Sequence, residues 1–203
     1  MPQTRSRSRT ENKFVDAVVA HLSEKGCEEL GVNTIAKRAG ADKVLIYRYF
    51  SNFEGLLETV AQEIEWLPEA ASCLPNSERE PLEALRDILQ TLRQTFAERP
   101  ASQALLNWRK AVQNPLTQRF NSDWNALWEE IANRLAAEQS YDNRHAWQTA
   151  LSLAALLLEA ELGGEAFHTD GLERAAAGLP STSAAVPETA PASESDSLPT
   201  NLL

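Results

Sequence analysis

The 203-residue sequence lacks the features of secreted, disulfide-rich and membrane-spanning proteins. Its two cysteines, Cys27 and Cys73, stand at no metal-binding spacing, and we expect both to be free thiols in a reducing cytoplasm. The longest apolar run, residues 151–158, contains Ser152 and is far too short to cross a bilayer. No apolar segment follows the arginines of the N-terminus, which argues against secretion. We therefore expect a cytoplasmic protein without a membrane partner.

Patterns typical of enzymes are also missing. The sequence has no Gly-rich phosphate loop, nucleophile elbow or cluster of metal ligands. His21 is interpreted as a half-exposed surface residue, since no second ligand stands at metal spacing. The neighbouring acids Glu159 and Glu161, like Glu129 and Glu130, are interpreted as solvated surface. The sequence therefore predicts a protein that is not an enzyme and uses no cofactor or metal.

Positive charge is scarce overall but is concentrated near the N-terminus. The formal net charge of the chain is -10. Residues 1–50 nevertheless carry nine Lys and Arg against six Asp and Glu, whereas the remainder carries ten against 23. An acidic body with a basic end is expected to orient on a polyanion with that end forward, without coating DNA indiscriminately.

The period-two alternation of a half-buried strand is absent from the sequence. Apolar residues instead recur every three or four positions, which predicts an all-α fold of about nine helices. The expected helices run from a Thr10 cap to Gly26, over residues 32–39 and 43–49, from a capping box at residues 51–54 to Pro68, from Pro81 to Arg99, from about Ala104 to Val112, and along residues 116–135 and 146–160. Residues 69–80 are expected to form a loop.

Residues 31–53 are expected to form two short helices joined by a tight turn. Gly40 supplies the backbone freedom for the turn, and the Asp42 carboxylate is expected to cap the second helix. Ile46 and Phe50 lie four positions apart and face inward. The other face is basic, aromatic and apolar, with Lys43, Val44, Tyr47 and Arg48. Such a face is typical of the recognition helix of a helix-turn-helix, although helical hairpins that bind no DNA share the same anchors and turn.

The same stretch also carries a family resemblance. The residues T-I-A-K-R-A-G-A-D-K-V-L-I-Y-R-Y-F, followed by S-N-F-E-G-L-L, closely resemble the N-terminal domain of TetR-family transcriptional regulators. The matching features are the Ile-Ala pair, the Ala-Gly turn, the capping residue and the Ile-Tyr pair before an aromatic. Val44 departs from the family's frequent Gly or Pro, and Phe53 from a Lys that often lies near a phosphate. The second departure puts one expected phosphate contact in doubt.

Nine residues are predicted to contact DNA. Thr34, Tyr47, Tyr49 and Asn52 are expected to hold phosphates, and Lys43 is expected to donate to guanine O6 or N7. Val44 and Leu45 offer methyl groups to thymine, whereas Arg48 suits either role. Asn33, beside Thr34 at the start of the first short helix, is the ninth candidate. The pair at 44 and 45 predicts thymine methyls in the operator half-sites.

The resemblance implies an N-terminal three-helix helix-turn-helix domain followed by a C-terminal helical bundle. We expect a flexible basic arm over residues 1–9, the helix-turn-helix domain over 10–53, a ligand-binding and dimerisation domain over 54–178, and a disordered acidic, Pro- and Ser-rich tail over 179–203. The arginines of the arm either reach phosphates and the minor groove or belong to a frayed, solvated terminus.

The body has two features that bear on partners. Apolar residues go nearly all round residues 146–160, so this helix is either central to one core or shared with a second subunit. The resemblance implies a homodimer through the last two helices, about residues 141–178. It also places a candidate effector pocket near five aromatic residues, Trp66, Trp108, Phe120, Trp124 and Trp128. Aromatic residues at helical spacing belong more often to the hydrophobic core than to a pocket.

These patterns predict a sequence-specific DNA-binding transcriptional regulator. By the resemblance, it is a dimeric repressor released from a palindromic operator on double-stranded DNA by a small-molecule effector. Two alternatives remain open at this point: a helical protein–protein adaptor that binds no DNA, and a TetR-like regulator without a small-molecule ligand.

Overall fold

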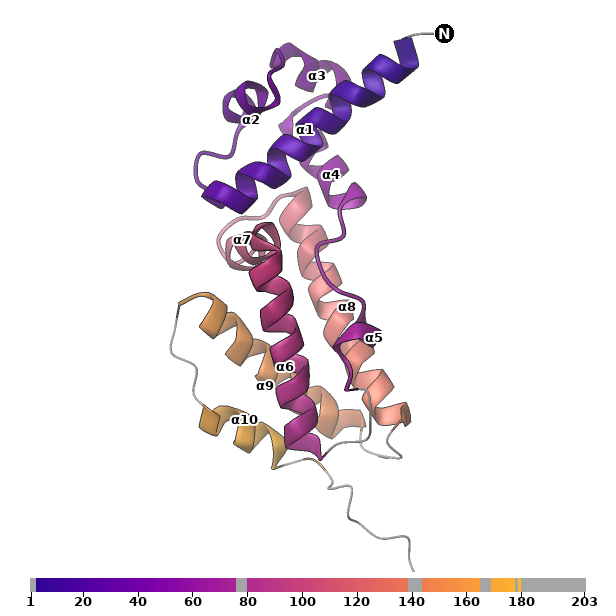
Figure 1. Ribbon diagram of the computed structural model, residues 1–203, viewed down its shortest axis with the longest axis vertical. Helices are drawn as coiled ribbons and strands as arrows, with labels where there is room; N and C mark the ends of the chain where they lie inside the picture. Colours follow the sequence, from indigo (N-terminus) through magenta and orange to yellow (C-terminus); the bar gives the residue numbers. More distant parts are fainter. Residues whose placement is uncertain (1–2, 76–79, 139–143, 165–168, 178, 180–203) are drawn as a thin grey trace, which may run out of the picture.

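The computed structural model describes residues 3–75, 80–138, 144–164, 169–177 and 179 (Figure 1). Within these ranges the chain forms ten α-helices and no strands, which confirms the predicted all-α class. The helices are α1 Gln3–Lys25, α2 Val32–Ala39, α3 Val44–Phe50, α4 Phe53–Glu63, α5 Ala70–Cys73, α6 Pro81–Glu98, α7 Pro100–Trp108, α8 Pro115–Glu138, α9 Arg144–Leu162 and α10 Thr169–Ala176. No helix in the described ranges combines the length and the apolarity needed to cross a lipid bilayer.

The first three helices form one end of an elongated molecule, and α5 to α10 form the body (Figure 1). Two elements join these parts: α7 packs against α1, and α4 leaves α3 to pack along α8. In the body α9 lies between α8 and α10 and contacts both. The helices α7 and α4 are therefore the contacts through which the body meets the N-terminal end.

The N-terminal core forms where the inward faces of α1, α2 and α3 meet. Phe14, Val18 and Leu22 are fully buried, as their four-residue spacing predicts. The Phe14 ring meets the Phe50 ring edge-to-face at 6.0 Å between centroids, and this contact fixes the end of α3 against α1. Ile46 is buried in the same cluster.

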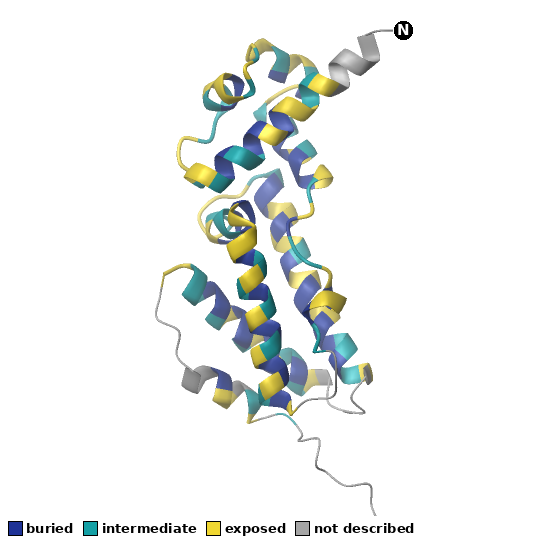
Figure 2. Cartoon of the chain, in the orientation of Figure 1, coloured by how far each residue is buried: buried dark blue, intermediate teal, exposed yellow. Residues whose placement is uncertain are grey.

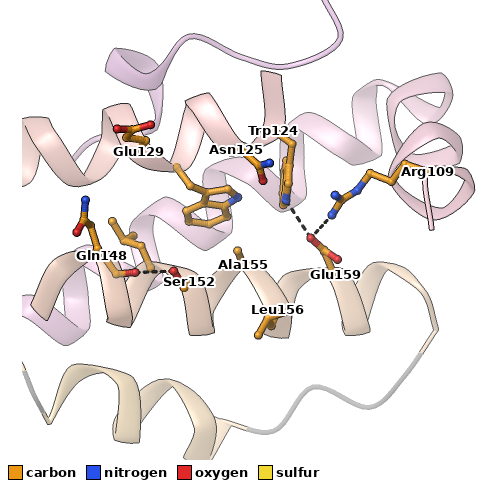
Figure 3. Close-up of a pocket in the computed structure, with 11 residues that line it drawn as sticks. Arg109, Trp124, Asn125, Glu129, Gln148, Ser152, Ala155, Leu156 and Glu159 are labelled. Carbon is orange, nitrogen blue, oxygen red and sulfur yellow. Dashed lines mark hydrogen bonds and ion pairs between the residues drawn. The ribbon is translucent and has the colours of Figure 1, made fainter. Parts of the chain in front are cut away.

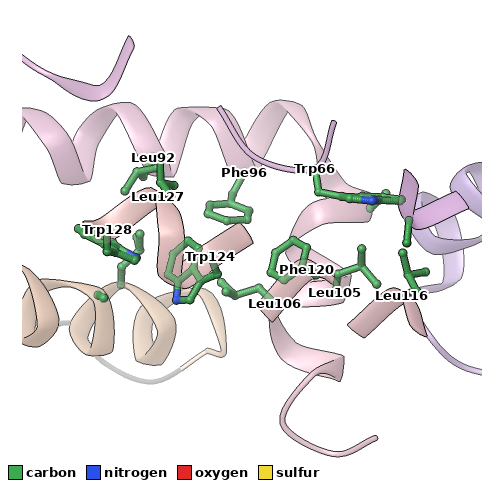
Figure 4. Close-up of a cluster of buried hydrophobic side chains, with 14 of the residues drawn as sticks. Trp66, Leu92, Phe96, Leu105, Leu106, Leu116, Phe120, Trp124, Leu127 and Trp128 are labelled. Carbon is green, nitrogen blue, oxygen red and sulfur yellow. The ribbon is translucent and has the colours of Figure 1, made fainter. Parts of the chain in front are cut away.

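The body has a long apolar core centred on α8. The predicted stripe on this helix is confirmed, because all six of its residues are buried (Leu116, Phe120, Trp124, Leu127, Ile131, Leu135). They pack with Leu92 and Phe96 of α6 and with Leu105 and Leu106 of α7 (Figure 4). Buried residues line the inward helix faces and exposed residues the outward ones (Figure 2), so burial follows the three- and four-residue periodicity of the sequence.

The predicted start of the first helix is wrong. We expected Thr10 to cap it after a flexible arm, but α1 already begins at Gln3, which places Thr10 inside the helix. Extension costs little because residues 3–9 contain neither Gly nor Pro and each further residue adds one backbone hydrogen bond. The side chains of residues 1–8 lie outside the described part of the chain.

The predicted capping box at residues 51–54 is also wrong. Ser51 adopts a left-handed φ of 68°, and Asn52 is the N-cap of α4 instead. The Asn52 Oδ1 accepts a hydrogen bond of 2.7 Å from the Gly55 N–H. Because Asn is as good an N-cap as Ser, the sequence alone could not choose between these adjacent residues.

The helix α4 ends at Glu63, five residues before the predicted stop at Pro68. The following segment is extended at Ile64 and carries Trp66 into the core, where the Trp66 carbonyl accepts a bond of 2.6 Å from Ser102 Oγ. A tertiary contact therefore ends this helix before its local stop signal. The short helix α5 then occupies part of the predicted loop at 69–80.

The helix α7 ends at Trp108 rather than Val112, which is exposed in the connection to α8. The next helix starts with a reciprocal cap: the Asn114 Oδ1 accepts from the Thr117 N–H at 2.9 Å, and the Thr117 Oγ1 accepts from the Asn114 N–H at 3.0 Å. Pro115, between these two residues, is the first residue of α8, where a missing N–H breaks no helical hydrogen bond.

The predicted tail at 179–203 lies outside the described residues except for Leu179, which packs partly against the core.

Candidate nucleic-acid interface

The turn between α2 and α3 has the predicted geometry. The helix α2 spans Val32–Ala39, and Gly40 ends it with a left-handed φ of 62°. The Asp42 Oδ1 then accepts a hydrogen bond of 2.9 Å from the Val44 N–H, as expected for the cap of α3. The helix α3 begins one residue later than predicted, at Val44.

Burial divides α3 into two faces, as the sequence predicts. Ile46 and Phe50 are buried against the domain core. Lys43 and Arg48 are exposed on the opposite side, together with 61% of Val44 and 52% of Tyr47. An exposed valine beside an exposed tyrosine and two cations offers apolar, hydrogen-bonding and charged groups to a partner.

The structure brings five of the nine candidate DNA contacts onto one exposed surface. The Lys43 Nζ donates to the Asn33 Oδ1 at 3.3 Å, which joins the start of α2 to the start of α3. We call this set the recognition surface: Asn33, Lys43, Val44, Tyr47 and Arg48, all exposed.

The remaining four candidates are placed differently. Thr34, Leu45 and Tyr49 are half-buried, and the last two pack against the core. Tyr49 also meets the Phe50 ring edge-to-face at 6.4 Å. Asn52 is exposed, but its Oδ1 is engaged as the cap of α4. The DNA contacts of these four residues stay predictions. Leu45, Tyr49 and Asn52 also stabilise the domain through the contacts just described.

Two polar contacts brace the helices behind the recognition surface. Arg38 of α2 forms an ion pair with Glu24 of α1, and this hydrogen bond lowers the pKa of the Glu24 carboxyl. His21 is buried, which corrects its interpretation as a half-exposed residue, and its Nε2 is hydrogen-bonded to the Glu28 carbonyl at 2.7 Å. No sequence pattern indicates this contact, because the partner is a backbone atom beyond the end of the helix.

Cys27 lies where the N-terminal domain meets α7. Its Sγ donates to the carbonyl of Ala104, 3.7 Å away, and burial raises the pKa of the thiol to about 12. Cys27 and Cys73 are both free thiols, as predicted. Cys27 therefore serves as a packing residue at the junction rather than as a reactive thiolate.

The body contains a pocket of about 470 Å³ between α8 and α9 (Figure 3). Of the five predicted ligand-binding aromatics, Trp124 and Trp128 line this pocket. Trp66 and Phe120 are buried elsewhere in the core, and Trp108 is half-buried at the end of α7. Helical spacing did not separate these positions, since a stripe of aromatics looks the same whether it faces a core or a pocket.

One wall of the pocket holds a carboxylate that the sequence did not reveal. Glu159 is only 8% exposed, so its interpretation as solvated surface is wrong. The Trp124 Nε1 donates to its Oε1 at 2.9 Å, Arg109 pairs with the same oxygen, and the Lys110 Nζ lies 3.2 Å from Oε2 (Figure 3 shows the first two). Glu159 directly follows the apolar run of residues 150–158. This position was the signal in the sequence that the acid could be buried.

Comparison with known proteins gives two results for this arrangement. The model of the bacterial regulatory proteins of the tetR family matches residues 14–60, which extend from α1 through most of α4. None of the curated proteins matches the chain by sequence.

Several solved structures are similar in fold to most of the chain. A TetR-like transcriptional regulator from Rhodococcus sp. RHA1 is similar with a TM-score of 0.54 and 22% identity, over 83% of this chain and 92% of that one. NalD, the secondary repressor of the MexAB-OprM multidrug efflux pump in Pseudomonas aeruginosa, gives a TM-score of 0.55 and 21% identity over 85% and 97%. A TetR-family transcriptional regulator from Haemophilus influenzae gives a TM-score of 0.52 and 16% identity over 86% and 98%.

At these identities the likeness establishes the fold, and the family model identifies the N-terminal domain. Residues 14–60 therefore match the tetR family of bacterial regulatory proteins, and the chain shares the all-helical fold of these solved regulators.

Proposed function

We propose that this protein is a sequence-specific DNA-binding transcriptional regulator that acts as a dimeric repressor and is released from its operator by a small molecule. The recognition surface carries this proposal. It presents two cations, a phenol and an exposed valine on a helix anchored from behind by Ile46 and Phe50. A helix presented in this way fits the major groove.

The groups on α3 suit different parts of the duplex. Lys43 reaches guanine O6 or N7, a contact that contributes about 1–3 kcal/mol of discrimination when well made. Val44 packs on thymine methyls, and Tyr47 with Thr34 holds phosphates, which gives affinity that falls with salt. Arg48 lies on the same surface and suits either role.

Dimerisation is proposed through α9 and α10. Leu156 of α9 is 62% exposed, and Ser152, one turn earlier on the same face, is also exposed. Both residues border the pocket between α8 and α9, so a second copy packed here would also cover one side of that pocket. A second copy packed on this face would remove Leu156 from water. Twofold symmetry would also present two recognition helices to half-sites one helical turn apart, where a single helix reads too few bases. Light scattering tests this step, since a monomer at working concentration would refute it.

Effector release is proposed through the pocket between α8 and α9. Arg109 lines the pocket and immediately follows α7, which packs against α1 of the DNA-binding domain. A ligand that contacts Arg109 is therefore one short helix away from that domain. Coupling requires that the ligand prefer the arrangement in which the two recognition helices no longer match successive grooves.

The proposal is tested by gel shift with the region upstream of the protein's own gene. We expect the wild type to shift this DNA and the double variant Lys43→Ala/Tyr47→Ala to lose the shift. Arg86→Ala, an exposed cation of α6 that pairs with Glu173 of α10 in the body, is the matched control and should bind as the wild type does. A wild type that shifts no promoter fragment would favour the adaptor alternative.

A second experiment isolates Val44. Replacing the operator thymines by uracil removes the methyl groups alone, so binding by the wild type should weaken. The Val44→Ala variant should lose less on the same replacement, since it has less side chain to contact the methyl. Indifference of the wild type to uracil would contradict the assignment of Val44.

A further inference from the structure

We propose that the pocket between α8 and α9 binds a hydrophobic monocarboxylate, with its carboxylate at the Arg109 end and its apolar body on the tryptophans. The inference deepens the proposed effector response and depends on it for its regulatory consequence. Binding of the ligand to the pocket can be measured without DNA.

The apolar part of the pocket is aromatic and aliphatic. Trp124 and Trp128 lie edge-to-face with ring centroids 5.5 Å apart, and Leu151 and Ala155 of α9 complete this part of the lining. A volume of about 470 Å³ suits a molecule with one or two rings or a short chain. These walls supply affinity for an apolar body but do not decide the charge of the ligand.

The charged groups favour an anion over a cation. Glu159 already receives Arg109, Lys110 and the Trp124 N–H, so it offers little further attraction to a cationic ligand. Two cations on one carboxylate leave a net positive charge at this end. The Arg109 guanidinium also lies 5.6 Å from the Trp124 ring centroid, so a cation already occupies a position over that ring.

Two donors of the lining point to the same class of ligand. The Arg109 Nε and the Trp128 Nε1 are buried and have no hydrogen-bond partner among the described residues. Trp128 is 8% exposed, and both residues line the pocket. Buried N–H groups need acceptors, and a carboxylate brings two acceptor oxygens and no donor. A ligand ammonium could satisfy neither N–H.

Glu129 is the group in the lining that opposes this conclusion. Glu129 lies toward the end of the pocket opposite Arg109 (Figure 3), and it is exposed, so water and salt screen its carboxylate. The Glu129 carboxylate and the Arg109 guanidinium therefore differ in their position in the pocket and in their burial. An acid seated at the Arg109 end is far less affected by Glu129 than by the buried guanidinium.

The charge of the ligand is tested by calorimetric titration of the full-length protein with three probes of one shape. These are β-naphthoate, the neutral β-naphthamide and the cationic β-naphthylmethylammonium. We expect the acid to bind about tenfold more tightly than the amide, since it gains charge-assisted hydrogen bonds, and the ammonium to bind least. An ammonium that binds as well as the acid, or an acid that does not bind at millimolar concentration, would overturn the proposal.

Matched variants then locate the site. Trp128→Phe keeps an aromatic ring but removes the buried, unpartnered N–H of a lining residue, and we expect it to weaken binding of the acid about fivefold. Trp66→Phe is the control, because its indole N–H is also buried without a described partner but does not line this pocket. Equal effects of the two variants would place the acid elsewhere.

The half-exposed Lys110 provides a charge test that leaves the core intact. Lys110→Gln should reduce the preference for acid over amide while leaving affinity for the amide unchanged. An unchanged preference would contradict the electrostatic argument. Gel shifts on the same preparations separate the two proposals: operator binding without naphthoate binding refutes the ligand class alone, and naphthoate binding without operator binding refutes the regulatory function alone.

Discussion

The first turn of α4 depends on a glycine that lies against the end of the recognition helix. A Cβ on Gly55 would stand 2.0 Å from the Phe50 carbonyl oxygen and 3.1 Å from its carbon. Both atoms are backbone, so no change of rotamer can relieve the overlap. In Gly55→Ala, α4 must therefore move away from α3, and the Asn52 cap on the Gly55 N–H must lengthen.

Two opposing effects decide the stability of Gly55→Ala. Alanine favours a helix over glycine by about 1 kcal/mol. Inserting a methyl group against fixed atoms costs about 1–3 kcal/mol, and an overlap with backbone at 2.0 Å belongs at the upper end of this range. We therefore expect a net destabilisation of about 1–2 kcal/mol, together with weaker operator binding because α3 loses its alignment with α4.

Urea unfolding followed by circular dichroism measures this difference. Glu58→Ala, an exposed position on the same helix, is the control and should change stability by less than about 0.5 kcal/mol. If Gly55→Ala is as stable as the wild type or more so, helix propensity dominates and the close approach of Gly55 to Phe50 does not exist.

Three further substitutions test contacts in the fold. Asn52→Ala removes the cap of α4 and should cost about 0.5–2 kcal/mol in urea unfolding, whereas Asn52→Ser should keep most of that stability; equal losses would contradict the cap. Trp124→Phe leaves Glu159 without one of its donors and should cost about 1–3 kcal/mol, more than Trp66→Phe, whose N–H has no described partner; the reverse order would contradict the network. Burial raises the pKa of the Cys27 thiol to about 12. The stability contributed by the protonated thiol is therefore complete below the unfolded pKa of about 8.5 and is lost as the pH rises toward the folded value. Cys27→Ala should therefore lose less stability between these limits than the wild type in a urea series, and an identical alkaline decline would refute the shift.

The recognition elements could be predicted from sequence because their signals are local. Gly40 ends α2 by its own backbone freedom, and Asp42 caps a helix that starts two residues later. The division of α3 into buried and exposed faces follows from helical spacing alone. Each of these features is decided within a few residues of the chain.

The features that sequence analysis missed depend on distant partners. The end of α4 depends on Trp66, whose carbonyl meets Ser102 from another helix. Glu159 is buried because Trp124 and Arg109, 35 and 50 residues away, bring donors to it. Helical periodicity predicts which face of a helix is apolar but not what that face meets, so the pocket could not be assigned before α8 and α9 were placed together.

The proposed function depends on the exposed face of α3 reading DNA. It is tested most directly by selecting bound duplexes from a random pool with the wild type and with Lys43→Ala/Tyr47→Ala. We expect the wild type to enrich a palindromic site with thymines in each half-site and to bind this site as a dimer, and the variant to enrich none. Enrichment of the same site by the variant, or of no site by the wild type, would contradict it.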